Sequence, residues 1–132
     1  MADTLQFDLV SPERKLASIE ATQVQIPGMT GDFTAMPNHA PFLTTLRPGV
    51  VRVIAGSETT EYVVTGGFAE ISPTNATILA EQAVPRGEAN PEMIASLLAD
   101  AEKARVDALE DTRQLADQRL RDVTSLKSAL SL

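Results

Sequence analysis

The distribution of glycine and proline constrains the fold of this chain more than any other feature. All seven glycines and all eight prolines lie at or before Pro91, whereas the segment from Glu92 to Leu132 contains neither residue type. Both residues mark turns and strand ends and disfavour the interior of a helix. The sequence therefore predicts two architectures in succession, a strand-rich region followed by a helical one.

Short apolar stretches of strand length recur in the first region, each bounded by turn residues. Apolar and polar side chains alternate in several of them, which is typical of strands with one face in a core. The predicted strands are Leu5 to Val10, Ala21 to Ile26, Val50 to Ala55, Glu61 to Thr65, Phe68 to Ile71 and Thr77 to Glu81. Several short strands at this spacing indicate a small β-sandwich or barrel.

Turn chemistry predicts how these strands are joined. Residues 55–58 and 73–76 have the composition of hairpin turns, and the Gly66-Gly67 pair predicts a bulge or a close backbone contact. The segment from Gly31 to Val53 holds three prolines, two glycines and the only histidine, so we expect short strands joined by rigid corners there. A stiff, irregular surface of this kind suits a protein partner.

The second region begins with three signals for the start of a helix. The Asn90 side chain can cap the first free amides, Pro91 has no amide to satisfy, and Glu92 favours the positive end of the helix dipole. Two apolar stripes follow at spacings of three and four residues, the first over 94–108 and the second over 116–130. The sequence predicts two amphipathic helices.

The connection between the two stripes leaves two interpretations open. Residues 111–114 resemble a capping box, which favours a hairpin turning near residues 109–112. One continuous helix is also compatible with the sequence, because no glycine or proline marks the turn.

The two halves of the helical region differ in charge. Residues 92–111 include six acidic and two basic residues, whereas residues 112–132 include two acidic and four basic residues. This asymmetry favours either pairing within the hairpin or docking of the last helix on an acidic partner.

Length and charge limit the functional classes. The chain has 132 residues, about the size of one domain, and a formal net charge of -7. An acidic surface argues against binding to nucleic acid and against direct docking on an anionic membrane. The sequence has no cysteine, no apolar run that could span a bilayer, and no signal or transit peptide pattern at its start. We therefore expect protein partners and a location in a reducing compartment.

The chain offers few groups for catalysis. His39 is the only imidazole, it lies between two prolines, and no metal-binding spacing surrounds it. A turn or interface role is the favoured interpretation for His39, and a small hydrolase that uses it as a base is the less favoured one. The sequence predicts no enzyme activity, no catalytic residue and no metal site.

Several motifs together point to a known family. They are LQFDLVSPERKL near the start, GDFTAMPNHAPFLTTLRPGVVRV in the proline-rich segment, the TGGFAEI and NATILAE strands, and the helical pair at the end. The PNHAPFLTTLRPG stretch is the most specific of them. On these motifs the whole chain resembles the epsilon subunits of bacterial F-type ATP synthases, which are the counterparts of the mitochondrial delta subunit.

The resemblance implies an α+β fold, with a ten-stranded β-sandwich at residues 1–88 and a mobile, regulatory antiparallel helical hairpin at residues 89–132. It implies a non-catalytic subunit of the central stalk, the rotor that couples proton-driven rotation of the c-ring to ATP synthesis. The implied partners are the gamma subunit and the c-ring, with the alpha and beta subunits as further partners of the helices. The implied location is the cytoplasmic face of the bacterial inner membrane, reached as a peripheral part of the complex.

The resemblance also implies interface residues. The residues carried over to the contact with the c-ring and gamma subunit are Gly28, Met29, Thr30, Gly31, Asp32, Asn38, His39, Ala40 and Pro41. The candidates for regulatory contacts to the catalytic head are Arg113, Arg119, Arg121 and Lys127. Since Asp117 and Asp122 interrupt these four cations, we expect only weak inhibition of ATP hydrolysis by the helices.

One departure from the family concerns nucleotide binding. Family members that bind ATP carry Ile or Leu, Asp, two variable residues, Arg and Ala at the start of the first helix. The matching stretch here is Asn90-Pro91-Glu92-Met93-Ile94-Ala95, in which only Ala95 fits the pattern. We therefore expect no bound ATP and no other cofactor. A function outside this family would be a stand-alone ligand-binding sandwich with a helical dimerisation tail.

Overall fold

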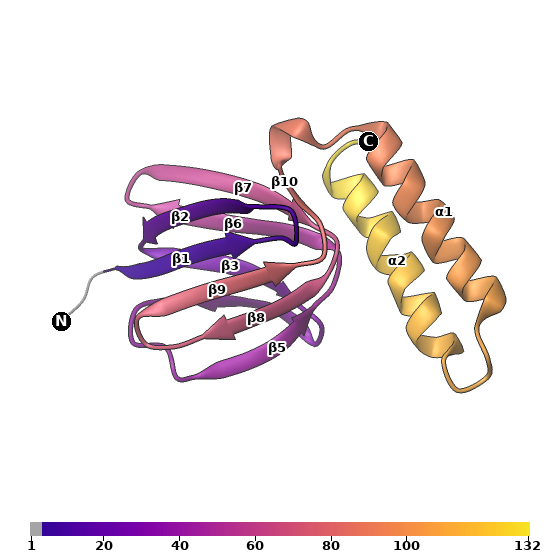
Figure 1. The fold of residues 1–132 in the computed structure, drawn as a ribbon, viewed down its shortest axis with the longest axis horizontal. Coiled ribbons are helices and arrows are strands. Elements are labelled where there is room, and N and C mark those ends of the chain that lie inside the picture. Colours follow the sequence, from indigo (N-terminus) through magenta and orange to yellow (C-terminus); the bar gives the residue numbers. More distant parts are fainter. Residues whose placement is uncertain (1–3) are drawn as a thin grey trace. The chain divides into compact units, whose positions relative to one another are not determined.

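The computed structural model describes residues 4–132 and divides the chain into two compact units, Met1–Arg86 and Gly87–Leu132. The first unit consists of strands and the second of two helices (Figure 1). The predicted α+β class, a ten-stranded β-sandwich followed by a helical hairpin, is confirmed. The boundary expected after residue 88 falls two residues beyond the end of the first unit.

Ten strands make up the first unit. They are β1 (Leu5–Val10), β2 (Lys15–Ala21), β3 (Gln23–Gly28), β4 (Gly31–Ala35), β5 (Phe42–Leu46), β6 (Gly49–Ala55), β7 (Glu58–Val64), β8 (Gly67–Ile71), β9 (Asn75–Ala80) and β10 (Ala83–Pro85).

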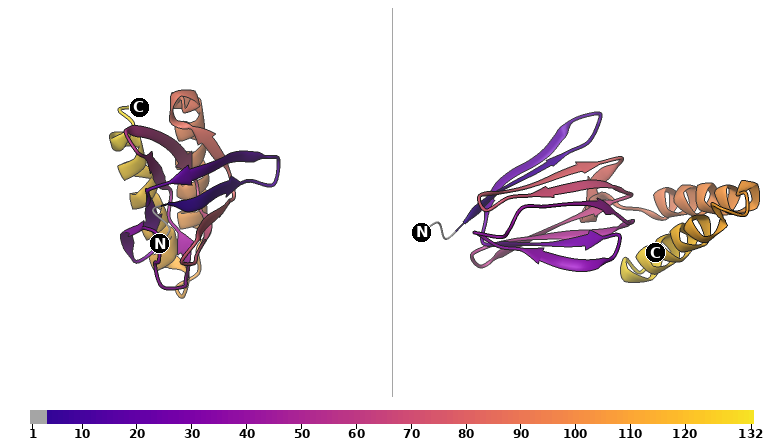
Figure 2. Two further views of the ribbon diagram at one scale, coloured as in Figure 1. Left: turned by 90° about the vertical axis from the view of Figure 1, so that its left-hand side faces the viewer. Right: turned by 90° about the horizontal axis from the view of Figure 1, so that it is seen from below.

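The strands form one sheet that curls over on itself. Their order is β10-β7-β6-β3-β5-β8-β9-β1-β2, and β4 pairs with β3 beside this path. Neighbours are antiparallel except β1 and β9, which run parallel. The curl brings Phe7 of β1 and Tyr62 of β7 together across the core, with their ring centroids 6.3 Å apart. Figure 2 shows the resulting sandwich from two further sides.

Alternation along the strands builds the core. In β1 the side chains of Leu5, Phe7 and Leu9 are buried while the residues between them are half-buried. The same period of two places Val51 and Val53 of β6 inside. Because every second side chain of a strand points to the same face, this pattern fixes which face of each strand is internal.

Gly67 shows how closely the backbones approach within the sandwich. A Cβ atom at this position would lie 2.1 Å from the Leu79 carbonyl oxygen, and the backbone φ is +131°, which L side chains rarely adopt. The close backbone contact predicted at the Gly66-Gly67 pair is therefore present. The predicted hairpin turns also occur, between β6 and β7 and between β8 and β9.

Some strands are not visible in the sequence pattern. The predicted strand over residues 21–26 in fact spans a break at Thr22, whose amide and hydroxyl both bond the Ile54 carbonyl oxygen, at 2.7 and 2.8 Å. β4 and β5 lie in the proline-rich segment, and β10 has only three residues and includes Pro85. These strands depend on pairing partners far along the chain, which local periodicity does not report.

The short 3₁₀ helix η1 (Arg86–Glu88) spans the boundary between the units, and α1 (Pro91–Asp107) and α2 (Arg113–Ala129) follow in the second unit. The Asn90 side chain accepts a hydrogen bond from the Met93 amide at 2.9 Å, so the predicted start of the first helix is confirmed. Two separate helices are present, and the alternative of one continuous helix is wrong for this structure. No helix among residues 4–132 is long and apolar enough to cross a membrane.

The turn between the helices differs from the predicted capping box. Thr112 precedes α2, but its side chain makes no capping bond to that helix. Its hydroxyl instead accepts from the Leu109 amide at 3.1 Å and lies 3.2 Å from the Leu109 carbonyl oxygen, which also accepts from the Thr112 amide at 3.0 Å. The threonine therefore closes the turn and is not available to cap the helix.

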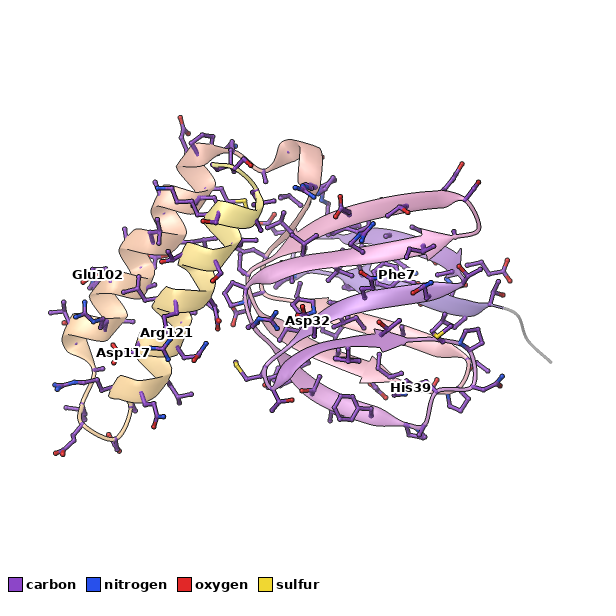
Figure 3. All side chains as sticks on the ribbon, turned by 180° about the vertical axis from the view of Figure 1, so that it is seen from behind. Phe7, Asp32, His39, Glu102, Asp117 and Arg121 are labelled. Atoms are coloured by element: carbon purple, nitrogen blue, oxygen red, sulfur yellow. The ribbon has the colours of Figure 1, made fainter. Side chains whose placement is uncertain are left out.

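The two helices lie side by side (Figure 3). An ion pair joins them near their connecting turn. The Arg105 guanidinium lies 3.2 Å from the Asp117 carboxylate of the other helix and 2.9 Å from the Glu102 carboxylate of its own. The buried apolar side chains of the helices are few and of moderate size: Ile94, Leu97, Ala101, Val123 and Leu126.

Candidate interaction surfaces

The first predicted interface segment, residues 28–32, forms the turn between β3 and β4. Met29 and Thr30 stand at its tip and are exposed, and the Met29 amide donates to the Thr45 carbonyl oxygen at 2.9 Å. A Cβ atom on Gly28 would lie 2.8 Å from the Gly31 carbonyl oxygen, so a larger residue cannot be placed there without a shift. The tip therefore presents two exposed side chains on a tightly folded hairpin.

Arg47 fastens this hairpin to the end of β5. Its guanidinium donates to the Gly28 carbonyl oxygen at 2.8 Å and pairs with the Asp32 carboxylate. Its backbone amide donates to the Pro27 carbonyl oxygen at 3.1 Å. Arg47 thus holds Pro27, Gly28 and Asp32 through three contacts, so the hairpin has a fixed conformation before any partner binds. The prediction of an interface here did not include Arg47.

The second predicted segment, residues 38–41, connects β4 to β5. The His39 amide donates to the Met36 carbonyl oxygen at 3.1 Å, and Asn38 has a φ of +71° in this turn. The Asn38 amide also donates to the Pro73 carbonyl oxygen at 2.7 Å, which ties the turn to the β8–β9 connection. The predicted rigid proline corner is thus present.

His39 occupies a structural position within this corner. Its ring nitrogen Nδ1 lies at hydrogen-bond distance from the Ala40 carbonyl oxygen, and its ring centroid lies 6.5 Å from that of Phe42. No group of three or more metal-ligating side chains occurs within residues 4–132. These contacts match the turn role expected for His39.

The structure separates the two predicted segments. Residues 28–32 precede or begin β4, and residues 38–41 follow it, so the two segments lie at opposite ends of that strand. Figure 3 shows Asp32 and His39 apart on the sandwich.

An exposed apolar surface was missed by the sequence prediction. Leu43 of β5, Phe68 of β8 and Leu79 of β9 are 68, 53 and 48% exposed. Thr45 of β5 pairs with Phe68, and Phe68 pairs with Leu79, so these side chains share the outer face of three neighbouring strands. We call Leu43, Phe68 and Leu79 the sheet patch. The alternation along β8 could have predicted this exposure. Ala69 and Ile71 point into the core, so Phe68, which lies one residue before Ala69, must point outward.

The four cations proposed for regulatory contacts do not form one surface. Arg113, Arg121 and Lys127 are exposed, and at about 100° per residue they fall within roughly one third of the circumference of α2. Arg119 lies on another side of the helix and is half-buried. Arg121 also donates to the Gln118 side chain at 2.8 Å.

The stretch that matches the nucleotide motif of other family members is occupied by structural residues. Asn90 caps α1, Pro91 is its first residue, and Ile94 is buried. These side chains offer no carboxylate or guanidinium at the motif's acidic and arginine positions.

Comparisons with known proteins agree on one family. The model of the ATP synthase delta/epsilon chain β-sandwich domain matches residues 4–86. An ATP synthase epsilon chain of Fuscovulum blasticum is 52% identical over 129 residues, which cover 98% of each chain. One from Rhodobacter capsulatus is 48% identical over 132 residues and the full length of both.

Solved structures agree with the fold. A chain in the Euglena gracilis mitochondrial ATP synthase, in a structure of its OSCP, F1 and c-ring, superposes with a TM-score of 0.75 at 23% identity. The match covers 98% of this chain and 83% of that one. With the full-length identity of about one half to epsilon chains from two organisms, the sequence and fold agree, and the chain belongs to the ATP synthase delta/epsilon family, within its epsilon chains.

Proposed function

We propose that this chain is a non-catalytic subunit of the central stalk of a proton-translocating F-type ATP synthase. In this role the β-sandwich passes rotation of the c-ring to the gamma subunit and so to the catalytic head. The observation that carries the proposal is the full-length likeness to ATP synthase epsilon chains. It disfavours a stand-alone ligand-binding sandwich and a hydrolase that uses His39.

The sheet patch is the surface best suited to a permanent partner such as the gamma subunit. Stable subunit interfaces are apolar at their centre, and a contiguous exposed apolar surface on a folded chain marks an interaction site. Leu43, Phe68 and Leu79 lie on paired strands, so they are held in place by the sheet. Burying them against a partner would remove apolar area from water without ordering a loop.

The β3–β4 tip suits a different partner. Thr30 and Asp32 are polar and exposed, and the hairpin is fixed by Arg47. We assign this tip to the polar surface of the c-ring. The corner at residues 38–41 lies at the other end of β4 and is assigned to a separate contact with the gamma subunit.

The cellular location follows from the complex. ATP synthases are membrane-bound, and we place this chain on the cytoplasmic face of a bacterial inner membrane, attached as a peripheral subunit through its partners. No ATP or other cofactor is expected to bind the helices. Calorimetry with ATP checks this expectation, and binding at submillimolar concentration would contradict it.

The helices are assigned a weak regulatory role toward the alpha and beta subunits. Only three of the four proposed cations are exposed, and exposed ion pairs contribute about 0–1 kcal/mol each. Deletion of residues 90–132 should therefore raise ATP hydrolysis by the assembled complex only modestly. A large rise would show that strong inhibition resides in these helices.

A two-part experiment tests the proposed function. Native mass spectrometry of complexes purified through a tagged copy should show one copy with the catalytic hexamer, a gamma subunit and a proteolipid ring. Recovery of the chain alone or as a homodimer would overturn the proposal. The variant Phe68→Asp should release the chain from the gamma subunit, whereas Thr60→Asp, at an exposed position of β7 outside the patch and outside residues 28–32 and 38–41, should not.

A further inference from the structure

The chain leaves the sheet at the start of the linker, which we define as residues 86–90, between β10 and α1. β10 is an end strand of the sheet and pairs with β7. Its last residue is Pro85, which has no backbone N–H to donate to a partner strand. Arg86 follows as the last residue of the first unit, and Figure 1 shows the chain passing from β10 toward α1. The strand pairing therefore ends one residue before the division between the units.

The Glu61 side chain of β7 extends this pairing beyond Pro85. Because Pro85 lies opposite Tyr62, the next residues of the two strands, Arg86 and Glu61, face each other. The Arg86 guanidinium lies 2.9 Å from the Oε1 atom of the Glu61 carboxylate. Opposite charges directly across two neighbouring strands stabilise the pairing of those strands. Glu61 thus holds the first residue of the linker beside the sheet.

Arg52 of β6 fixes the same carboxylate from the other side. Arg52 is the register partner of Glu61, and its Nε atom lies 3.5 Å from Oε2. Each oxygen of the Glu61 carboxylate therefore faces one guanidinium, and the Glu61 side chain is only 27% exposed. Solitary surface ion pairs contribute little to stability, but a network of charges with restricted side chains contributes more. We expect the row of Arg52, Glu61 and Arg86 to be stronger than a solitary surface pair.

The linker itself has little packing. None of the three residues of η1 is buried. A Cβ atom on Gly87 would meet no atom within 4 Å. Segments with few buried contacts separate from the rest of a protein at a low cost in free energy. A contact made by one side chain at Arg86 is therefore enough to change how often the linker leaves the sheet.

We propose that Glu61 is a positioning residue that holds the start of the linker on the sheet and so limits the motion of the helical unit. While the ion pair with Arg86 is formed, the chain moves independently of the sheet only from Gly87 onward. When Glu61 loses its charge, Arg86 separates from β7 more often, and the helical unit reaches a wider range of positions. This inference depends on contacts within the sandwich unit and does not require the rotor function.

Limited proteolysis of the full-length chain, followed by mass spectrometry, tests the proposal. Trypsin cleaves after arginine, and the Arg86–Gly87 bond enters the protease only when the linker separates from the sheet. Glu61→Gln should raise the rate of this cleavage roughly two- to fivefold, as expected for the loss of one partly exposed ion pair. Glu58→Gln is the matched control, because it removes the same charge from an exposed position of the same strand, and it should leave the rate unchanged.

Two further readouts separate release of the linker from unfolding of the sandwich. Cleavage after Arg52, in the middle of β6, requires the sandwich to unfold, so it should remain much slower than cleavage after Arg86 in every variant. Raising the salt concentration to roughly 1 M should speed cleavage after Arg86 in the wild type and leave the rate in Glu61→Gln unchanged. The activity of trypsin on a short peptide corrects both rates for the effect of salt on the protease.

A distance measurement tests the consequence for the helical unit. The chain has no cysteine, so Ser57→Cys in the sandwich and Ser125→Cys in α2 can each carry one spin label at an exposed position. Pulsed electron paramagnetic resonance then gives the distribution of distances between the two labels. This distribution should be broader in Glu61→Gln than in the wild type or in Glu58→Gln.

Several results would overturn the proposal. Equal rates of cleavage after Arg86 in the wild type and in Glu61→Gln would mean that another contact holds the linker. A rise shared with Glu58→Gln, a salt dependence that persists in Glu61→Gln, or an unchanged distance distribution would also contradict it. Absence of the chain from ATP synthase complexes, with these results as expected, would contradict the proposed function and leave this inference standing.

Discussion

Phe7 in the sandwich and Leu126 in the hairpin are both almost fully buried, but their surroundings come from different distances along the chain. Phe7 lies on β1, which pairs with β2 and β9, and its ring stacks on that of Tyr62 in β7. Leu126 lies on one of two consecutive helices. Removing one contact in the sandwich therefore affects strands throughout the unit, whereas the hairpin depends on a few local contacts.

This comparison suggests a division of work. A rotor part that transmits torque must resist deformation, and a core of interlocked large side chains does so because interiors are close-packed. A regulatory or docking part must be able to change its contacts, and elements with few buried side chains do so at low cost. Each prediction below tests whether the two units differ in this way.

The largest effect is expected in the sandwich core. Phe7→Ala should lower the free energy of unfolding of the sandwich by about 3–5 kcal/mol, because it removes a fully buried ring and leaves a cavity. Urea unfolding followed by the fluorescence of Tyr62, the only tyrosine in a chain without tryptophan, measures this loss. Phe42→Ala is the control, because that ring is 42% exposed and packs against Phe33 and His39 outside the buried core.

A smaller and local effect is expected in the hairpin. Leu126→Ala should destabilise the helices by about 2–4 kcal/mol. The helical circular dichroism should then be lost at lower urea concentration than the Tyr62 signal, which reports the sandwich. Leu115→Ala, on the same helix but exposed, should change neither transition. A single transition shared by both signals would show that the two units unfold together.

Much of this contrast could be predicted from the sequence. The absence of glycine and proline after Pro91 indicates where the helical unit begins. The alternating pattern of β1 and the helix cap at Asn90 are local features, so the sequence around them is enough to predict their conformation. Arg47 and Asp32 could not be linked in advance, since their contact depends on how the hairpin and β5 are brought together. Such pairings are set by tertiary structure and leave no local periodicity.

The interaction surfaces were harder to predict than the fold for a similar reason. Leu43, Phe68 and Leu79 look like ordinary strand residues until the register puts them beside one another on the outer face. Residues 111–114 were expected to form a capping box, but Thr112 closes the turn instead, because its hydroxyl bonds the backbone of Leu109. Whether a given residue is buried or exposed depends on the strand register and on the contacts within the turn. Neither can be predicted from composition.

A third prediction tests rigidity in the sandwich backbone. Gly67→Ala should destabilise the sandwich by about 2–3 kcal/mol, because it combines a disfavoured φ with a clash against the Leu79 carbonyl oxygen. Gly56→Ala is the matched control. Its φ is also positive, at +64°, but a Cβ atom there meets open space, so a cost of only about 1 kcal/mol is expected. Equal costs in the same urea titration would mean that the backbone near Gly67 moves freely.

The smallest effect concerns the pH dependence of the sandwich. Desolvation raises the pKa of the Asp8 carboxyl, but hydrogen bonds from Ser18, Lys15 and Gln6 and the charge of Lys15 outweigh it, so the net pKa lies below its ordinary value. A carboxyl with a lowered pKa in the folded state adds stability above its unfolded pKa, and this stability is lost as the pH falls through the folded pKa.

Asp8→Asn should therefore reduce stability at neutral pH and have little effect in strong acid, where the wild-type carboxyl is protonated. Glu13→Gln is the control, because it removes the same charge from an exposed carboxylate outside this network. Its stability, measured over the same pH range, gives the effect of the change in net charge alone. The hairpin should show no matching difference, because Asp8, Lys15 and Ser18 all lie in β1 and β2. If the gap between wild type and Asp8→Asn instead grew as the pH fell, the polar network on β1 and β2 would not stabilise the charged form.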